Sequence, residues 1–372
     1  MRILALDLGK FKSVACDYDQ KSGKHEFETI KTNGQEIHDL VLEREPDRVV
    51  FEVGPAAGWI YDLVVSMGIE VQVANVNHEG WRWKNTKRKN DRLDALRLAQ
   101  LSAMNQLPMV HIPKRQVRQQ RALITYRQTL VKRCTQIKNS IRAILDREGL
   151  KLPPGKKGWT GKQLEELHQM SVPMIKAGIN DLWRGLLRVE LEALSAMKTY
   201  LYEVETKLNR LAKKNKQIIL LQSAAGVGPR LAEAVVAFID DPHRFKSGKQ
   251  VGSYAGLTPR QYQSGSMDHQ GRISGQGNKF LRSLLVEVSW MSLRWNPWAK
   301  QTYERLCRGS ASRKKIAITA VARKLLVRCW AMLRDEEVWQ TKHPPCLESA
   351  EHSKKEDVRI FSPPNMAATV GG

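Results

Sequence analysis

Residues 113–145 carry an apolar side chain every seven positions and contain no aspartate or glutamate. The repeat consists of Leu123, Leu130, Ile137 and Ile144, with Cys134 and Ile141 at the alternate position. Nine lysines and arginines lie in the same stretch. This spacing predicts one long helix with an apolar seam and an outer surface of a single charge sign.

A second heptad pattern follows a break in the chain. The break, "LKLPPGKKGWTGK" at 150–162, is rich in proline and glycine, and the pattern resumes over 187–211. Two such helices can form an antiparallel hairpin or a dimerisation arm, whereas the competing interpretation is a pair of ordinary bundle helices inside one domain.

The N-terminal part of the chain has a different pattern. Short apolar strands are expected over 2–8, 13–18 and 25–32, followed by a helix over 34–45. Residues 47–75 then read as strand, turn, helix and strand. Early strands followed by alternating helix and strand indicate an α/β domain with a mixed sheet.

These patterns predict four segments. Residues 1–107 form the α/β domain, and residues 108–216 form a basic helical coiled-coil region with a break near 150–162. Residues 217–335 form a compact helical domain that includes a glycine turn and a serine-rich loop, and the polar tail 336–372 is predicted to be disordered.

The charge balance indicates a polyanionic partner. Lysine and arginine number 61 against 38 aspartates and glutamates, which gives a formal net charge of +23. Nucleic acid is the default partner for such an excess, and DNA is the first candidate. A basic membrane-surface protein is the less favoured alternative, and no membrane partner is expected. No run of 18 apolar residues is present, so no segment is expected to span a bilayer. The five cysteines stand singly, which suits a reducing cytoplasm and argues against a zinc site or a disulfide framework.

Four acidic residues stand at the ends of predicted elements in this basic chain. Asp7 and Glu52 each end a strand just before a glycine-containing turn, and Asp91 and Asp94 share one face of the helix that begins there. Carboxylates of this kind suit Mg²⁺ or Mn²⁺, and a metal pair about 3.5–4 Å apart serves phosphodiester chemistry. The plainer interpretations are turn aspartates and an acidic first helical turn that complements the helix dipole. The basic run Lys87, Arg88 and Lys89, which only Asn90 separates from Asp91, favours a nuclease-like site.

The sequence "AAGVGPRLAEAVV" at 224–236 places Gly226 and Gly228 between two predicted helices. It is typical of a helix-hairpin-helix, in which backbone N–H groups hold a DNA phosphate without reading sequence. Arg230 supports that interpretation, whereas a tight turn that only requires positive φ would need no ligand.

A segment rich in glycine, serine and arginine covers 259–282, between two predicted helices. Ser264 lies between Arg260 and Arg272, and Lys279 and Arg282 stand on the helix that follows. Cationic neighbours can neutralise a phosphate while a hydroxyl attacks it. The residues alone do not separate Ser264 from Ser266 or Ser274, and a plain flexible loop is the simpler interpretation.

Several blocks in order resemble the DEDD-type insertion-sequence transposases of the IS110 family and its IS1111 subgroup. They are Asp7, Glu52, "KNDRLDALRLA", the basic helical region, "GVGPRLA", "YAGLTPRQYQSG" and "GRISGQGNKFLRSLL". The resemblance implies a RuvC-like, RNase-H-type domain over 1–107 with the tetrad Asp7, Glu52, Asp91 and Asp94. It also implies a C-terminal transposase domain over 217–335, in which Ser264 forms a covalent link to DNA.

The resemblance also implies partners. Members of this family are guided by a non-coding RNA that the element encodes, and a homo-oligomer, either a dimer or a tetramer, is expected. The basic helix is our candidate for binding the phosphates of that RNA, through Arg118, Arg121, Lys132 and Arg133. A prokaryotic cytoplasmic location at the nucleoid follows. Two positions depart from the family pattern. Asn90 stands before Asp91 where family members commonly have threonine, and Gly275 stands where they commonly have lysine.

Three alternatives remain open on the sequence. A structure-specific endonuclease of the Holliday-junction-resolving kind would use the four acids alone and would not need Ser264. A sugar-kinase-like or actin-like ATPase is suggested by "LDLGK", although no second phosphate turn follows. A nucleic-acid-binding protein without catalytic activity is the third alternative.

Overall fold

The computed structural model describes residues 1–75, 90–264 and 267–340. The chain divides into two compact units, Met1–Tyr126 and a second unit that begins at Arg127. The division falls within the long helix α4 (Arg115–Arg147). Each unit is described by itself.

The first unit is built on a five-stranded mixed sheet with the order β3-β2-β1-β4-β5. Strands β1 (Arg2–Asp7), β2 (Lys12–Asp19) and β3 (His25–Lys31) form an antiparallel meander. Strands β4 (Arg48–Glu52) and β5 (Glu70–Ala74) extend the sheet in parallel from β1. An α/β domain with a mixed sheet, as predicted from the sequence, is therefore confirmed.

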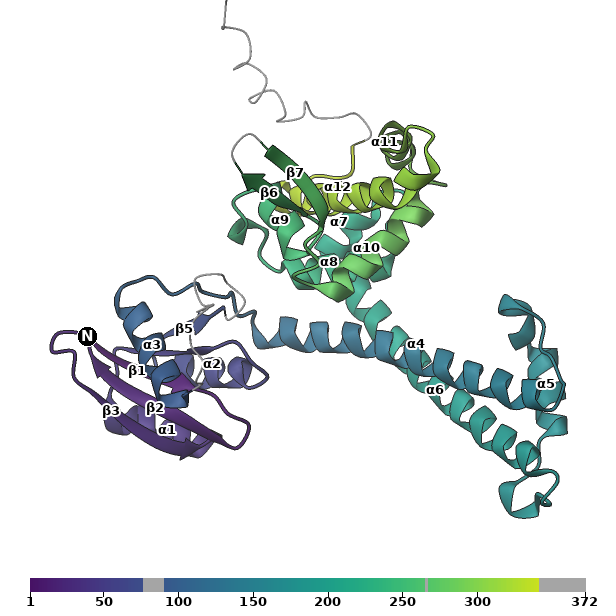
Figure 1. The fold of residues 1–372 in the computed structure, drawn as a ribbon, viewed down its shortest axis with the longest axis horizontal. Coiled ribbons are helices and arrows are strands. Elements are labelled where there is room, and N and C mark those ends of the chain that lie inside the picture. The colour runs from purple at the N-terminus through teal and green to yellow at the C-terminus, as the bar shows by residue number, and fades with distance from the viewer. Residues whose placement is uncertain (76–89, 265–266, 341–372) are drawn as a thin grey trace, which may run out of the picture. The chain divides into compact units, whose positions relative to one another are not determined.

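Helices cover both faces of this sheet (Figure 1). Side chains alternate along a strand, so Leu4, Leu6 and Phe51 point to the face that α1 (Gly34–Arg44) and α2 (Ala57–Ser66) cover. The intervening Ile3, Ala5 and Val50 point to the opposite face and pack under α3 (Asp91–Ala103). The sheet thus has two apolar faces, each with its own helical cover.

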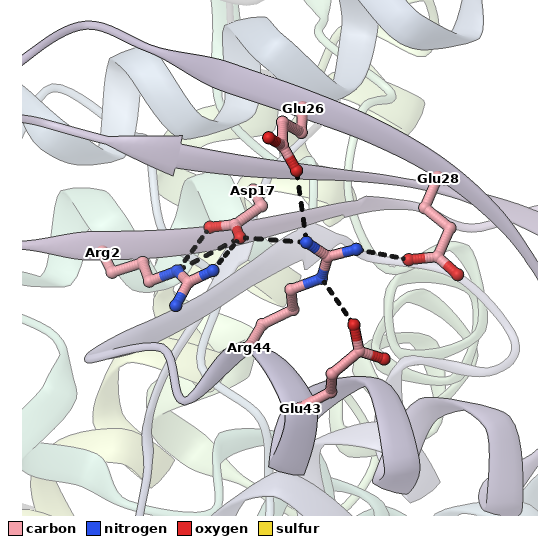
Figure 2. A network of polar contacts seen from close by, with 6 residues as sticks. All are labelled: Arg2, Asp17, Glu26, Glu28, Glu43 and Arg44. Carbon is pink, nitrogen blue, oxygen red and sulfur yellow. Dashed lines mark hydrogen bonds and ion pairs between the residues drawn. The ribbon is translucent and has the colours of Figure 1, made fainter.

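A network of ion pairs ties α1 to the strands beside it (Figure 2). Arg44 on α1 contacts Glu28 at 3.0 Å and Glu26 at 3.3 Å on β3, and it reaches Asp17 on β2 at 3.9 Å. Asp17 also pairs with Arg2 of β1 at 2.6 Å. These acids are matched by arginines, and they lie on the face that α1 and α2 cover.

The second unit begins with an antiparallel pair of long helices, the rest of α4 and α6 (Leu182–Lys213). Arg127 of α4 bonds Glu205 of α6 at 2.7 Å, and farther along the pair Leu145 and Leu187 share one apolar cluster. The connection contains η2 (Gly155–Trp159), α5 (Gly161–Met170) and η3 (Met174–Lys176). The pairing within one chain is the antiparallel arrangement that the two heptad patterns allowed.

The rest of the second unit packs around α12 (Lys314–Asp335), which contacts several helices and has ten buried residues. Its other helices are α7 (Lys216–Gln222), α8 (Pro229–Ile239), α9 (Gly248–Tyr254), α10 (Lys279–Ser292) and α11 (Pro297–Cys307), with the short turns η4 (Pro242–Arg244) and η5 (Ala311–Arg313). Strands β6 (Pro259–Ser264) and β7 (Met267–Ile273) form a separate two-stranded sheet.

The segment expected as a loop therefore forms a β-hairpin. The strand β6 reads PRQYQS and is exposed on both faces, so it has no alternation of apolar and polar residues to reveal it. No helix among the described residues is long and apolar enough to cross a bilayer. The predicted disorder of the tail concerns positions that, from 341 onward, lie outside the described residues.

Candidate active site and nucleic-acid contacts

Asp7 and Glu52 end neighbouring parallel strands. The register pairs Leu6 of β1 with Phe51 of β4, so the two acids are the next residues along their strands. Both follow the alternation of Ile3, Ala5 and Val50, which pack under α3. The sheet therefore directs both carboxylates toward the face that α3 covers, and both side chains are half-buried.

Helix α3 brings Asp91 and Asp94 to the same place. Asn90 caps the helix, because its side chain accepts a hydrogen bond from the backbone N–H of Arg92 at 3.1 Å. One turn farther on, Ala95 and Leu98 are fully buried against the sheet. The two aspartates therefore occupy the first turn of the buried stripe, above the strand end that carries Asp7.

The carboxylates of Asp7, Asp91 and Asp94 converge. Each offers an oxygen, and these oxygens all lie within 4.8 Å of one another. Asp7 and Asp94 are half-buried, whereas Asp91 is exposed. Glu52 stands on the adjacent strand and is not part of this group of three within the described residues. Three hard oxygen ligands so close together fit a divalent cation, because the cation offsets the repulsion between them.

Arg97 is a neighbour of this cluster that the sequence reasoning missed. Burial lowers the pKa of its guanidinium, and the negative charge of Asp94 opposes that shift. The two residues are three positions apart on α3 and so share a helix face. The spacing of three residues between Asp94 and Arg97 was the sequence signal that could have identified Arg97 as a neighbour of the cluster.

The predicted nucleic-acid contacts of α4 fall into two groups. Arg118 is engaged inside the first unit, because its guanidinium pairs with Asp62 of α2 and donates to the Pro113 carbonyl at 2.7 Å. Lys132 and Arg133 have exposed side chains, whereas Arg121 is half-buried. The positions of Lys87, Arg88 and Lys89 lie outside the described residues.

The glycine turn joins α7 to α8 and is tightly packed. Gly226 has φ of +88°, and a Cβ added there would lie 2.7 Å from the Ser292 hydroxyl oxygen on α10. Gly228 is the N-cap of α8 and has open space around it. Arg230 is committed within the protein, since it bonds the buried Glu233 at 2.8 and 3.0 Å and also the Asn209 side chain.

Ser264 is the last residue of β6, where it pairs with Met267 across the hairpin, and its side chain is exposed. Arg260, Arg272 and Lys279 are exposed around the same hairpin and the start of α10. Arg260 reaches the Ser274 carbonyl at 3.4 Å. Arg282 is half-buried and donates to the Ala255 carbonyl at 2.8 Å, so it supports the hairpin base.

A mixed sheet with a carboxylate cluster at the ends of its strands, in a chain of net charge +23, is typical of metal-dependent enzymes that act on nucleic acid. Two family models match the chain: one described as a transposase of the DEDD type over residues 4–149, and one described as the transposase IS116/IS110/IS902 family over residues 219–304. The transposase for insertion sequence element IS1111A of Coxiella burnetii is 30% identical over 353 residues, which cover 91% of this chain and 92% of that protein. The chain belongs to the IS110/IS1111 family of transposases, enzymes that cleave and rejoin DNA.

A second relative is also described as a transposase. A probable family 20 transposase of Pseudomonas aeruginosa is 27% identical over 256 residues, which cover 68% of this chain and 74% of that protein. Among solved structures, RuvC of Thermus thermophilus in complex with a Holliday junction substrate aligns with 30% of this chain and 99% of its own, at 12% identity and a TM-score of 0.23.

Proposed function

We propose that this transposase cleaves DNA strands at an acidic metal site formed by Asp7, Glu52, Asp91 and Asp94, and that Ser264 is its nucleophile. The observation that carries the proposal is the convergence of Asp7, Asp91 and Asp94 within 4.8 Å. Glu52 completes the tetrad because it ends the strand next to Asp7 and points to the same face of the sheet. On this proposal the first unit is the RuvC-like, RNase-H-type catalytic domain.

The ion that suits these ligands is Mg²⁺, with Mn²⁺ as a close substitute, because both prefer carboxylate oxygens. When bound, such an ion would polarise the scissile phosphate and neutralise charge that develops on its oxygens. Asp7, Glu52, Asp91 and Asp94 would hold the ion. Asn90 caps the first turn of α3, and Ala95 and Leu98 fix that helix on the sheet, so that the two aspartates of α3 face the strand ends.

Ser264 would attack the phosphorus atom with its hydroxyl oxygen. A new phosphorus–oxygen bond to Ser264 forms as the bond to the leaving sugar oxygen breaks. The serine proton passes to a basic group or to solvent, and the leaving oxygen takes up a proton to become a hydroxyl. Reversal of these steps with another strand's hydroxyl restores the phosphodiester and frees Ser264. Arg260 and Arg272 are exposed on the same hairpin and would balance the charge of the phosphate.

The partners follow from the family and from charge. The DNA substrates would be the ends of the element and the target site. A guide RNA encoded by the element would direct the protein to them, and the exposed Lys132 and Arg133 of α4 would bind the phosphates of that RNA. The protein would act as a homo-oligomer in the bacterial cytoplasm. The glycine turn at Gly226 and Gly228 would contact DNA through backbone N–H groups at the start of α8, since the Arg230 side chain is already bound to Glu233 and Asn209.

The second candidate is a junction-resolving endonuclease that needs no serine. It is favoured by one observation, which is that the three converging carboxylates all belong to the first unit. Labelled DNA carrying the element ends, separated on a denaturing gel after reaction, discriminates between the two. We expect a protein–DNA adduct with wild type that is absent from Ser264→Ala and from Asp94→Asn. Free nicked DNA without an adduct would instead establish the endonuclease, and an adduct retained by Ser264→Ala would transfer the role to Ser266 or Ser274.

A further inference from the structure

The connection between α4 and α6 forms one side of an open basic cavity that the acidic site does not use. The cavity has a volume of about 620 Å³. Four cationic side chains line it, namely Lys138 and Arg142 of α4, Lys156 of η2 and Lys198 of α6. Thr135 and Asn139 of α4 add polar groups. We call this cavity the basic pocket.

Two of these cations are held in place. The Lys138 ammonium lies 5.2 Å from the centre of the Trp159 ring, and the Arg142 guanidinium lies 5.4 Å from it. A cation over an aromatic ring is attracted by the electrons of that ring. Arg142 also donates to the Pro153 carbonyl at 3.0 Å. The two charges therefore need little ordering when a ligand binds.

The proline- and glycine-rich break builds this arrangement. Gly158 is buried, and a Cβ added there would lie 2.5 Å from the Pro153 carbonyl oxygen and 3.0 Å from a terminal nitrogen of Arg142. Only glycine lets the backbone of η2 approach Arg142 so closely. The proline- and glycine-rich break therefore connects two helices and also forms part of the pocket lining, to which it contributes Lys156 and Trp159.

The charges of the basic pocket are not balanced by its own walls. Among the described residues that line it, none is an aspartate or a glutamate. Lys138 and Arg142 are four positions apart on one helix, an arrangement that destabilises a helix when both charges have the same sign. Elsewhere on the same helix pair a cation is matched, because Arg127 bonds Glu205 at 2.7 Å. The pocket therefore concentrates positive charge at a cost in stability that an anionic ligand would offset.

We infer that the basic pocket binds a phosphodiester group of a nucleic-acid strand. Lysine, arginine, threonine and asparagine are the side chains that hold phosphates in such complexes. A volume of 620 Å³ lies within the range of small-ligand pockets, roughly 300–1,000 Å³, so a phosphate and its sugars fit. The inference takes its class of partner from the transposase family and does not depend on the chemistry proposed for Asp7, Asp94 or Ser264.

Chemical footprinting of the intact wild-type protein tests this inference without any substitution. Lysines are acylated with and without a labelled single-stranded RNA, a DNA duplex or inorganic phosphate, and the modified positions are quantified by mass spectrometry. We expect either nucleic acid to protect Lys156 and Lys198 several-fold, with protection fading as salt is raised. The exposed Lys162 of α5 and Lys207 of α6 are internal controls that should stay reactive. Equal protection of all four lysines, or protection by inorganic phosphate at the same concentration, would overturn the inference.

A pair of matched double variants gives the second measurement. Lys156→Gln with Lys198→Gln removes two charges from the pocket, and Lys162→Gln with Lys207→Gln removes two charges from outside it. All four side chains are exposed, so both proteins should fold. The slope of log affinity for the single strand against log salt should fall by about 1.4 in the pocket variant, at ~0.7 per lost contact, and by less than half of that in the control. The same loss in both variants would show a general charge effect and would refute the pocket.

Strand cleavage is measured separately in all three proteins. If nucleic acid protects Lys156 and Lys198 of the wild-type protein but no DNA is cleaved, the pocket is supported and the acidic-site proposal is contradicted. If DNA is cleaved in a metal-dependent manner while both lysines stay reactive, the acidic-site proposal is supported and the pocket is contradicted. The two failures are therefore distinguishable.

Discussion

The carboxylates of Asp7 and Asp94 offer oxygens within 4.8 Å of each other, although Asp7 ends strand β1 and Asp94 lies in the first turn of helix α3. Like charges at this separation repel each other unless a cation lies between them. Asp91 adds a third oxygen to the same group. A divalent cation bound among these three oxygens would offset the repulsion between the carboxylates.

Replacing Asp7 or Asp94 with Asn is expected to abolish DNA strand cleavage and to leave nucleic-acid binding nearly unchanged. The amide keeps the shape of the side chain but removes a charged ligand, so a divalent ion is held less firmly. Thermal unfolding with and without Mg²⁺ provides the second readout, because an ion that binds only the folded state raises its stability. Wild type should be stabilised by Mg²⁺, and both variants should lose that gain in thermal stability.

The exposed Asp39 of α1 is the matched control, and Asp39→Asn should behave as wild type. Full cleavage by Asp7→Asn in Mg²⁺ would contradict the assignment.

The basic surface of α4 is expected to act through Lys132 and Arg133 more than through Arg118. Changing Lys132 and Arg133 together to Gln should lower the salt slope of RNA binding by about 1.4–1.8, at roughly 0.7–0.9 per lost phosphate contact. Arg118→Gln should lower the slope less and reduce the stability of the first unit, because Arg118 is paired with Asp62 and bonded to Pro113. Binding titrations at several salt concentrations, together with thermal unfolding, measure both effects. A larger slope change from Arg118→Gln would reverse this order.

Glu233 should make the stability of the protein depend on pH. Burial raises the pKa of its carboxyl above the ordinary value of 4.5, and the charge and hydrogen bonds of Arg230 oppose that shift. A raised pKa means that the folded state holds the proton more firmly than the unfolded state does. The contribution to stability is therefore fully present below about pH 4.5 and is lost as the pH rises through the folded-state pKa. Chemical unfolding at a series of pH values should show this loss in wild type, and Glu233→Gln should lack it. Parallel pH profiles for the two proteins would contradict the shift.

Local periodicity explains how much of the fold and the candidate site could be predicted. The alternation of strands β1 and β4 and the spacing of Asp91 and Asp94 are properties of short segments, so the sequence indicated that these acids stand at element ends. Their convergence also needed α3 to lie on the face that carries Ile3 and Ala5, which is a matter of tertiary packing.

The contacts that the sequence could not predict join distant segments. Arg118 and Asp62 are far apart in the chain, and nothing near either residue indicates the pair. The same holds for Arg230 and Asn209, which is why Arg230 was expected to contact DNA. The hairpin of β6 and β7 was missed for another reason, since Tyr262 and its neighbours in β6 are exposed and polar and show no buried face.

Gly226 and Gly228 offer a closely matched pair of substitutions in one turn. Gly226→Ala should destabilise the second unit, because its φ of +88° is strained for alanine and the new Cβ would meet Ser292 at 2.7 Å. A cost of about 1–3 kcal/mol is expected from the backbone strain alone. Gly228→Ala should cost less than about 1 kcal/mol, since φ is −80° at the N-cap and no atom lies within 4 Å of the added Cβ.

Urea unfolding measures the difference in stability, and DNA affinity is measured at a temperature where both variants are folded. If the turn binds a phosphate through its backbone, Gly228→Ala should retain stability and lose affinity only slightly, whereas Gly226→Ala should lose both. Equal stability of the two variants would show that the turn can move away from α10, and that the close approach of Gly226 to Ser292 is not required.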